Sequence, residues 1–411
     1  MENHPPALSD AWTKHSLMKP AFKQTNVGMI PEDWEVKVLP DVCRFRGGKA
    51  HEQYISEAGP FVCVNSKFIS TDGKVRKHSS ANFCAAKRND VLMVMSDLPN
   101  GRALAKAYLV EQDDLYAVNQ RVCALTAYRD CPEYLFYVLN RNPYFLKFDD
   151  GVSQTHLLNH VFEKCQLPMP PTVDEQRAIA GALSDVDALL RALSQLIAKK
   201  RDLKQAAMQQ LLTGHTRLPG FHAEWDMKQF GEVAFPRRDR VDPRRTGVHE
   251  FCVELEHIAS ASGNLLGSTS TSGQSSLKSV FHPGDVLFGK LRAYLRKYWL
   301  VTRSGVCSTE VWVLTPKDRL VTTEFLFQLI KTDEFIEAAS NSYGTHMPRS
   351  DWNIVKNYEV AIPPLPEQTA IAAVLGEMDT ELAGLEQRRE KFSALKQAMM
   401  QELLTGKTRL V

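Results

Sequence analysis

Basic side chains gather in short clusters in two separate stretches of this chain, and such clusters can neutralise the phosphates of a nucleic acid. In the second half, five arginines crowd between 237 and 245, and further basic residues lie around Tyr294 and Tyr298. The first half carries smaller groups, beside Gly47-Gly48 and after Asn100. One run of charges is usually only a solvated surface, so the recurrence in both halves is what favours phosphate contact. The candidates are Arg44, Arg46, Lys49, Lys67, Arg102, Arg237, Arg238, Arg240, Lys290, Arg292 and Tyr294.

Other polar side chains could read base edges, because arginine pairs with guanine while asparagine and glutamine pair with adenine. His156 and His346 occupy equivalent places near the ends of the two halves, but neither has an acid or a nucleophile at motif spacing. We interpret them as residues that close a domain or touch a DNA backbone. The candidates for this second set are Asn65, Gln120, Arg121, Gln154, Thr155, Asn341, Thr345, His346 and Arg349.

Catalytic motifs are missing from the sequence. Gly406-Lys407-Thr408 lacks the upstream glycine of a phosphate-binding loop, and no Gly-x-Gly-x-x-Gly occurs. Asn142-Pro143-Tyr144-Phe145 lacks the second proline of an amino-methyltransferase motif, and Glu35-Val36-Lys37 lacks a partner carboxylate for a nuclease site. The eight cysteines include no Cys-x-x-Cys pair. We therefore predict no catalytic residue, no metal site and no disulfide framework in this chain.

A long internal repeat must position these side chains. Residues 175–218 align without a gap on 367–410, and 24 of the 44 aligned pairs are identical. A repeat of this length that occurs twice indicates two half-molecules rather than a stacked array.

Each copy of the repeat has the pattern of a long helix. Apolar residues follow three-four spacing from Leu183 to Ile197 and from Leu375 to Leu385, and at spacing four the stripe continues through Leu203 and Leu395. Such a stripe is often just the buried face of one helix. Because it occurs twice, without a partner in its own half, we expect the two helices to pair as an antiparallel coiled coil.

The ends of these helices carry start and stop signals. Pro170-Pro171 and Pro363-Pro364 block earlier starts, and Thr172 with Glu175 has the spacing of a capping box. Gly214 and Gly406 stand where a left-handed cap is expected.

The remaining sequence divides into two globular α/β domains, which we call the first head and the second head. At 411 residues, with 44% hydrophobic and 24% charged side chains, the chain can bury real cores. No stretch is apolar enough to span a membrane, and residues 1–20 lack the apolar region of a signal peptide, so we expect a cytoplasmic protein. The predicted layout is an N-terminal segment 1–24, the first head 25–165, a helical region 166–217, the second head 218–361 and a helical region 362–411.

The exposed faces of the two repeat helices are also candidates for a binding surface. Their glutamines and lysines recur at equivalent positions, which suits the docking of partner helices as well as a solvated face. These residues are Lys204, Gln205, Gln209, Lys396, Gln397 and Gln401.

The pattern resembles the specificity subunit of a type I restriction-modification system. The resemblance rests on Pro170-Pro171 to Ala180, on Pro363-Pro364 to Ala372, and on the two Leu-Leu-Thr-Gly-x-Thr-Arg-Leu endings, and it spans nearly the whole chain. It implies an α+β fold in which two target-recognition domains are joined by two long conserved helices in an antiparallel coiled coil with a pseudo-twofold internal repeat.

The resemblance also implies partners. Each domain would read one half of a bipartite, asymmetric target in double-stranded DNA. Two modification subunits would methylate adenine with S-adenosylmethionine, and two restriction subunits would use ATP and Mg to cleave DNA. This chain itself would be non-catalytic and carry no cofactor.

Two other readings stay open. The chain could be an adaptor whose coiled coil carries two protein-binding heads, or a fused enzyme with a hidden nuclease or methyltransferase activity. Salt-sensitive binding to duplex DNA separates the first reading from DNA recognition, and an activity assay of the chain alone tests the second.

Overall fold

The computed structural model describes residues 21–99, 101–341 and 348–410, which form two compact units. Unit 1 holds the chain up to Ala192 together with the segment from Arg389 onward, and unit 2 holds Leu193–Arg388. Most of the predicted N-terminal segment, and the candidate residues Thr345 and His346, lie outside the described residues.

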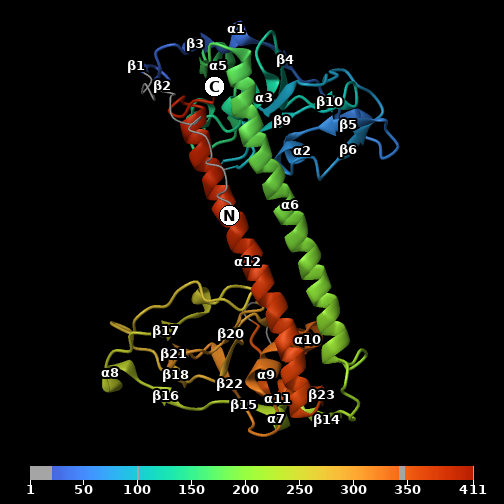
Figure 1. Cartoon of the computed structure of the whole chain (residues 1–411), viewed down its shortest axis with the longest axis vertical. Helices are drawn as coiled ribbons and strands as arrows, with labels where there is room; N and C mark the ends of the chain where they lie inside the picture. Colours follow the sequence, from blue (N-terminus) through green and yellow to red (C-terminus); the bar gives the residue numbers. More distant parts are fainter. Residues whose placement is uncertain (1–20, 100, 342–347, 411) are drawn as a thin grey trace, which may run out of the picture. The chain divides into compact units, whose positions relative to one another are not determined.

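Unit 1 contains the first head. Its sheets are a four-stranded one in the order β4-β11-β7-β9, a three-stranded one in the order β10-β5-β6, and the pairs β1-β2, β3-β13 and β8-β12 (Figure 1). The strands are β1 Phe22–Thr25, β2 Gly28–Pro31, β3 Glu35–Val38, β4 Cys43–Gly47, β5 Phe61–Val64, β6 Lys77–Ser79, β7 Val91–Val94, β8 Ser96–Asp97, β9 Ala107–Leu109, β10 Tyr116–Val118, β11 Val122–Ala127, β12 Thr155–His156 and β13 Gln166–Met169. The short helices are α1 Leu39–Val42, α2 Ser66–Ser70, α3 Pro132–Leu139, α4 Pro143–Leu146 and α5 Asn159–Glu163.

Unit 2 contains the second head. It has two four-stranded sheets, β15-β22-β19-β20 and β16-β18-β21-β17, and the pair β14-β23. The strands are β14 Asp226–Gln229, β15 Ala234–Pro236, β16 Arg240–Val241, β17 Cys252–Val253, β18 Lys278–Phe281, β19 Val286–Gly289, β20 Tyr298–Leu300, β21 Gly305–Ser308, β22 Val311–Pro316 and β23 Glu359–Ile362. The helices are α7 Phe230–Val233, α8 Pro243–Thr246, α9 Thr323–Leu329, α10 Asp333–Ser340 and α11 Trp352–Val355. The prediction of mixed α and β structure is confirmed.

The two heads share one core although their sequences differ. The buried strand β7 lies between β11 and β9, and the buried strand β19 lies between β22 and β20, with antiparallel pairing throughout. Continuous apolar runs suit these strands because both faces are covered. Helix α3 packs on the first of these sheets, and α9 packs on the second.

Each head contains a buried aspartate at the start of its central strand, and the two aspartates bind the same kinds of partner. In the first head, Asp90 accepts hydrogen bonds from Arg46 at 2.5 Å and from the Thr126 hydroxyl at 2.5 Å. In the second head, Asp285 accepts from Arg237 at 3.0 Å and from the Thr315 hydroxyl at 2.6 Å. Each carboxylate also accepts a backbone N–H three residues before it. A buried charge requires such a set of partners, and its recurrence shows that the heads are variants of one fold.

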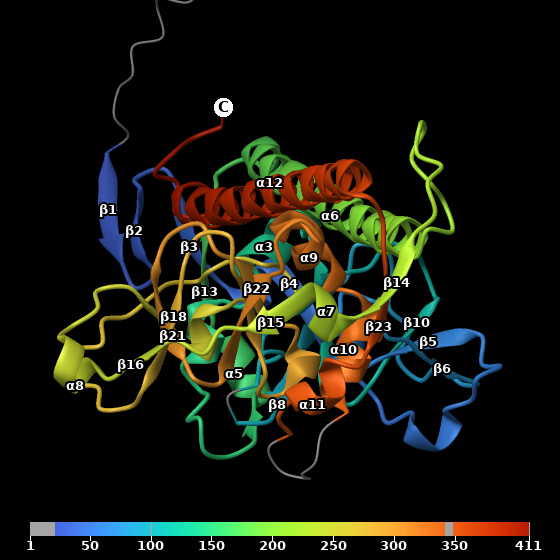
Figure 2. The ribbon, with the colours of Figure 1, turned by 90° about the horizontal axis from the view of Figure 1, so that it is seen from below.

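Two long helices, α6 Val173–Leu212 and α12 Leu365–Leu403, supply residues to both units. Within each unit the two helices lie side by side and run antiparallel (Figures 1 and 2). In unit 1, Lys396 pairs with Asp187 at 2.6 Å, and in unit 2 its counterpart Lys204 pairs with Asp379. The repeat offset of 192 relates these two ion pairs, so each is the copy of the other.

The end of each long helix is tied to the start of the other. Arg409 binds the Glu175 carboxylate, and Arg217 binds the Glu367 carboxylate with both contacts at 2.6 Å. In both units a tryptophan lies beside the arginine, Trp34 in unit 1 and Trp225 in unit 2. These ties are again related by the repeat offset of 192.

The predicted helix signals are largely confirmed. The Glu175 N–H donates to Thr172 Oγ1 at 3.2 Å, which is half of a capping box, while the Glu175 side chain binds Arg409 instead of closing the box. Gly214 and Gly406 have φ of +73° and +69°, in the left-handed region. The predicted apolar stripe is wrong at Leu203 and Leu395, which are 48% and 47% exposed. At these two positions, the contact between α6 and α12 buries a narrower strip of each helix than the apolar spacing in the sequence predicted.

Candidate nucleic-acid interface

A hollow in the first head brings together five side chains from three separate stretches of the sequence. It measures about 530 Å³ and is lined by Ser96, Gln120, Arg121, Gln154 and His156. Strand β8 pairs with β12, so Ser96 lies opposite His156. The Gln154 amide donates to Ser96 Oγ at 3.0 Å, which fixes the orientation of that side chain. All of these residues except Ser96 are exposed.

The glutamines of this hollow are held by polar neighbours. The Gln120 amide donates to Glu52 Oε1 at 3.1 Å, and Asn119 donates to the same oxygen. These hydrogen bonds lower the pKa of Glu52, with the largest effect from Asn119. A carboxylate that stays charged keeps Gln120 oriented, and an oriented amide can offer both a donor and an acceptor to a base edge.

A hollow in the second head has a different character. It measures about 380 Å³, and its charged lining residues are Arg237, Arg238, Arg240 and Lys290, with no carboxylate among its described lining. Arg237 is committed to Asp285, and its hydrogen bonds to that carboxylate raise its pKa. Arg238 and Arg240 are exposed. The electrostatic field of this hollow therefore attracts anions.

Several predicted contact residues already have partners inside their own head. Arg46 binds Asp90, and the Asn65 side chain caps α2 by accepting the Phe68 N–H at 2.9 Å. Arg349 binds Glu310 at 2.8 Å. Arg44 lines a separate hollow beside Tyr128. The sequence analysis predicted a DNA contact for all four of these residues. In the structure, Arg46, Asn65 and Arg349 each make a side-chain contact within their own head, and a sequence alone does not predict such contacts.

The remaining candidates lie on the surface without contributing to either hollow. They are exposed side chains on α2, on the loop after β8, on the turn after β19 and at the end of α10, and Lys49, which bridges to Asn119 through its backbone. Thr155 is buried in β12, with its hydroxyl directed to Asp149. The exposed members are Lys67, Arg102, Arg292, Tyr294 and Asn341.

Strand pairing corrects one equivalence between the heads. The sequence aligns His156 with His346, but the backbone places Arg349 opposite Leu291 just as His156 lies opposite Ser96. The next hydrogen bond agrees, because Leu157 donates to Met95 and Ser350 donates to Lys290. The prediction of a matched histidine pair is therefore wrong: the structural counterpart of His156 is Arg349. The paired residues are 58 or more positions apart in the chain, so no local sequence pattern predicts these strand pairings.

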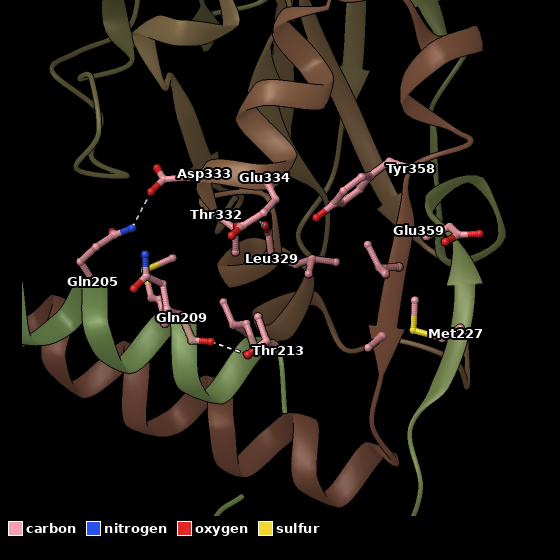
Figure 3. A pocket seen from close by; sticks show the side chains of 14 residues that line it. Gln205, Gln209, Thr213, Met227, Leu329, Thr332, Asp333, Glu334, Tyr358 and Glu359 are labelled. Atoms are coloured by element: carbon pink, nitrogen blue, oxygen red, sulfur yellow. Dashed lines mark hydrogen bonds between the residues drawn. The ribbon is translucent and has the colours of Figure 1, made fainter. Parts of the chain in front are cut away.

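The proposed docking residues divide into two groups. Lys204 and Lys396 form the ion pairs between α6 and α12, and the Gln205 amide donates to Asp333 at 2.9 Å. Gln209, Gln397 and Gln401 are exposed. In unit 2, Gln205 and Gln209 also border a cavity of about 280 Å³ between α6 and the strands β14 and β23 (Figure 3). The lysines thus stabilise the helix pair, and the exposed glutamines retain the docking prediction.

No group of three or more metal-ligating side chains occurs among the described residues. Burial raises the pKa of Cys131 and of Cys252 to about 11, so these thiols stay protonated near neutral pH. Within the described part of the chain, no helix is long and apolar enough to cross a membrane.

Two heads of one fold that carry unlike polar surfaces define a two-headed recognition protein. The chain matches the family model described as the type I restriction modification DNA specificity domain over residues 31–200 and 259–391. It belongs to that family.

Relatives and solved structures agree with this assignment. The chain is 23% identical to the type I restriction enzyme MjaVIII specificity subunit of Methanocaldococcus jannaschii, over 95% of this chain and 96% of the relative. The crystal structure of the type I restriction-modification S subunit from M. genitalium has a TM-score of 0.58 at 14% identity and covers 94% of this chain and 99% of that one. A chain in a structural study of complex assembly in the type I R-M system has a TM-score of 0.53 at 19% identity, with 92% and 99% covered. These likenesses establish a shared fold.

Proposed function

We propose that this chain selects the DNA target of a type I restriction-modification complex by reading one half of a bipartite, asymmetric sequence with each head. The observation that carries the proposal is the pairing of one shared fold with two unlike surfaces. The first head offers amides, an imidazole and a guanidinium, which suit base edges, and the second head offers a basic hollow. Because the two heads present different side chains, we expect them to bind two different half-site sequences.

The long helices would fix the separation of the half-sites as an antiparallel coiled coil. Support comes from the antiparallel ion pairs in each unit and from buried positions such as Leu193, Ile197 and Leu375. Two modest readers on one rigid spacer bind tightly only to DNA that offers both half-sites at the matching distance. To change that distance, an insertion of one heptad must be made in both helices, since an insertion in α6 alone breaks the register of Lys204 and Asp379.

The exposed helix faces would dock the modification subunits. Leu203 and Leu395 support this proposal, because both repeats leave a leucine half exposed at the same position. Exposed glutamines lie six residues further along each helix, at Gln209 and Gln401. Because each helix exposes one leucine and one glutamine at equivalent positions of the repeat, two identical partner subunits could each bind one helix through the same kind of contact.

In this proposal the chemistry belongs to the partners. Two modification subunits would use S-adenosylmethionine, two restriction subunits would use ATP and Mg, and this chain would be non-catalytic and bind no cofactor. The arrangement of its polar residues supports this, because the side chains that line the hollow with His156 are Ser96, Gln120, Arg121 and Gln154, and they include no carboxylate that could orient the imidazole as a general base.

Binding to duplex DNA as a function of salt tests the proposal. The chain in complex with its modification subunits should bind a duplex that carries its mapped methylation motif, with a steep loss of affinity as salt rises. Arg238→Ala and Arg240→Ala should each reduce the salt slope by about 1 if the side chain contacts a phosphate. Arg177→Ala, on the exposed side of α6, is the matched control and should leave the slope unchanged.

The same experiment distinguishes DNA recognition from the alternative interpretation, an adaptor protein with two protein-binding heads. A complex that methylates nothing and binds DNA no more tightly at low salt than at high salt would refute DNA recognition and favour two protein-binding heads. Methylation or cleavage by the chain alone, with methyl donor or Mg, would refute the non-catalytic assignment.

A further inference from the structure

Each head carries a loop at the same place, between a central strand and the edge strand of its four-stranded sheet. We call residues 95–99 and 101–105, which include the two-residue strand β8, the first tip loop, and residues 290–296 the second tip loop. The first connects β7 to β9, and the second connects β19 to β20. Their ends are equivalent, because Val94 donates to Lys106 and Gly289 donates to Lys297, and the residue before each lysine is left-handed, with φ of +55° and +52°.

Both tip loops expose a large apolar side chain and an arginine. Leu98 is 67% exposed in the first tip loop, and Tyr294 is 55% exposed in the second. Arg102 and Arg292 are exposed in the same loops. A single exposed leucine or tyrosine is ordinary on a protein surface. Here the loops differ in length and sequence, yet both connect equivalent strands and both carry this combination.

The first tip loop is built to hold its shape. The Asp97 carboxylate accepts the backbone N–H groups of Leu98 at 2.9 Å, Ala103 at 2.6 Å and Leu104 at 3.0 Å. Gly101 N–H also donates to the Leu98 carbonyl at 2.9 Å. A loop ordered in this way presents its apolar side chain without paying an ordering entropy on binding.

Other contacts hold the second tip loop in place. Leu295 donates to the Arg292 carbonyl and Arg292 donates to the Pro348 carbonyl, at 2.8 and 2.9 Å. The Arg296 guanidinium anchors the end of the loop on the Lys331 carbonyl and on the Asp333 carboxylate. Tyr294 lies at the turn that these contacts define.

The tip loops adjoin the two polar hollows. Ser96, two residues before Leu98, lines the hollow of Gln120 and Gln154. Lys290, two residues before Arg292, lines the basic hollow of the second head. DNA that contacts either hollow is therefore within reach of the apolar tip.

We propose that Leu98 and Tyr294 act as wedges that enter between neighbouring base pairs and unstack a base step at each half-site. The proposal rests on the DNA-reading function above. Apolar wedges flanked by basic side chains deform duplexes in this way, and stacking of a base on an aromatic ring stabilises the unstacked state. Unstacking lowers the energy needed to take a base out of the duplex, which prepares the target for a base-modifying partner.

Duplexes with 2-aminopurine at each position of the mapped target test the wedges, because this base brightens when it is unstacked. The complex with modification subunits should raise the fluorescence at one step in each half-site. Leu98→Ala should remove the signal in one half-site and Tyr294→Ala the signal in the other. Tyr294→Ala, which loses a stacking ring, should also lower the affinity by roughly tenfold. Leu266→Ala removes a leucine of 73% exposure outside both tip loops and should change neither readout.

The outcomes separate the wedge from the function on which it rests. Specific, salt-sensitive binding with no fluorescence increase, or an increase that persists in Leu98→Ala and Tyr294→Ala, would overturn the wedge and leave DNA recognition intact. A wild-type complex that binds no duplex specifically would overturn both. Circular dichroism of each variant, expected to match the wild type, shows that a lost signal does not come from unfolding.

Discussion

Arg409 is expected to stabilise unit 1 by neutralising a buried carboxylate. Its guanidinium binds Glu175, whose side chain is only 1% exposed, and also binds Asp33 with two contacts of 2.9 Å. These bonds and charges raise the pKa of Arg409, with the largest effect from Glu175. The pairing ties the last residues of the chain to the first turn of α6 and to the entry of the first head.

Replacing Arg409 with alanine leaves the Glu175 charge buried without its partner. Removing one partner of a buried ion pair costs about 3–5 kcal/mol, and Arg409 is 19% exposed, so we expect the low end, about 3 kcal/mol. For a unit of roughly 150–250 residues this corresponds to a fall in Tm of about 6–12 °C. Urea unfolding measures the free energy, and hydrogen exchange in β3 and β13 assigns the loss to unit 1.

Two further variants test the reasoning. Arg409→Ala combined with Glu175→Gln removes the stranded charge and should recover part of the loss. Arg177→Ala breaks a pair with Asp174 in which the side chains are 67% and 92% exposed, and should cost less than about 0.5 kcal/mol. If Arg409→Ala cost no more than Arg177→Ala, the inference that Glu175 depends on its partner would be refuted.

Two other perturbations have defined outcomes. Desolvation lowers the pKa of Lys331 from 10.5 to about 8 despite its contact with Asp379, so the unfolded chain binds more protons between pH 8 and 10.5. The wild type should therefore gain about 3 kcal/mol of stability over Lys331→Met across that window, and a pH-independent difference in urea unfolding would contradict this. Gly406→Ala should destabilise unit 1, because its φ is +69° and a Cβ would lie 2.6 Å from the Pro31 ring. Gly376→Ala, in open space on α12, should stabilise unit 2 by about 1 kcal/mol; thermal melts in which both variants move Tm in the same direction would count against the argument.

The sequence predicts most about the repeat and least about the surfaces. An internal identity of 24 pairs in 44, together with apolar periodicity and terminal glycines, predicts the two long helices and their ends. These signals are local, since a helix is built from contacts three and four residues apart. The ion pairs that register the helices were not predicted, because Lys204 and Asp379 are far apart in the chain.

The roles of individual basic residues required the tertiary structure. In the sequence, Arg46, Arg237 and Arg238 are equivalent members of charge clusters. The fold gives the first two a buried carboxylate and leaves the third exposed. The difference arises from strand pairing, which brings Asp90 and Asp285 to the ends of the guanidinium groups.

The sequence by itself thus determined the twofold design, the helices and the family, because a repeat and a helix are encoded in neighbouring residues. Only the tertiary structure decided that the heads share one core, that His156 corresponds to Arg349, and that Gln120, Gln154 and His156 meet in one hollow. Sheets join segments that are distant in the chain, and a one-residue shift of register moves every side chain to the other face. The proposed recognition surface lies on such sheets and on the loops between them, so its composition follows from folding and is not visible in any short stretch of sequence.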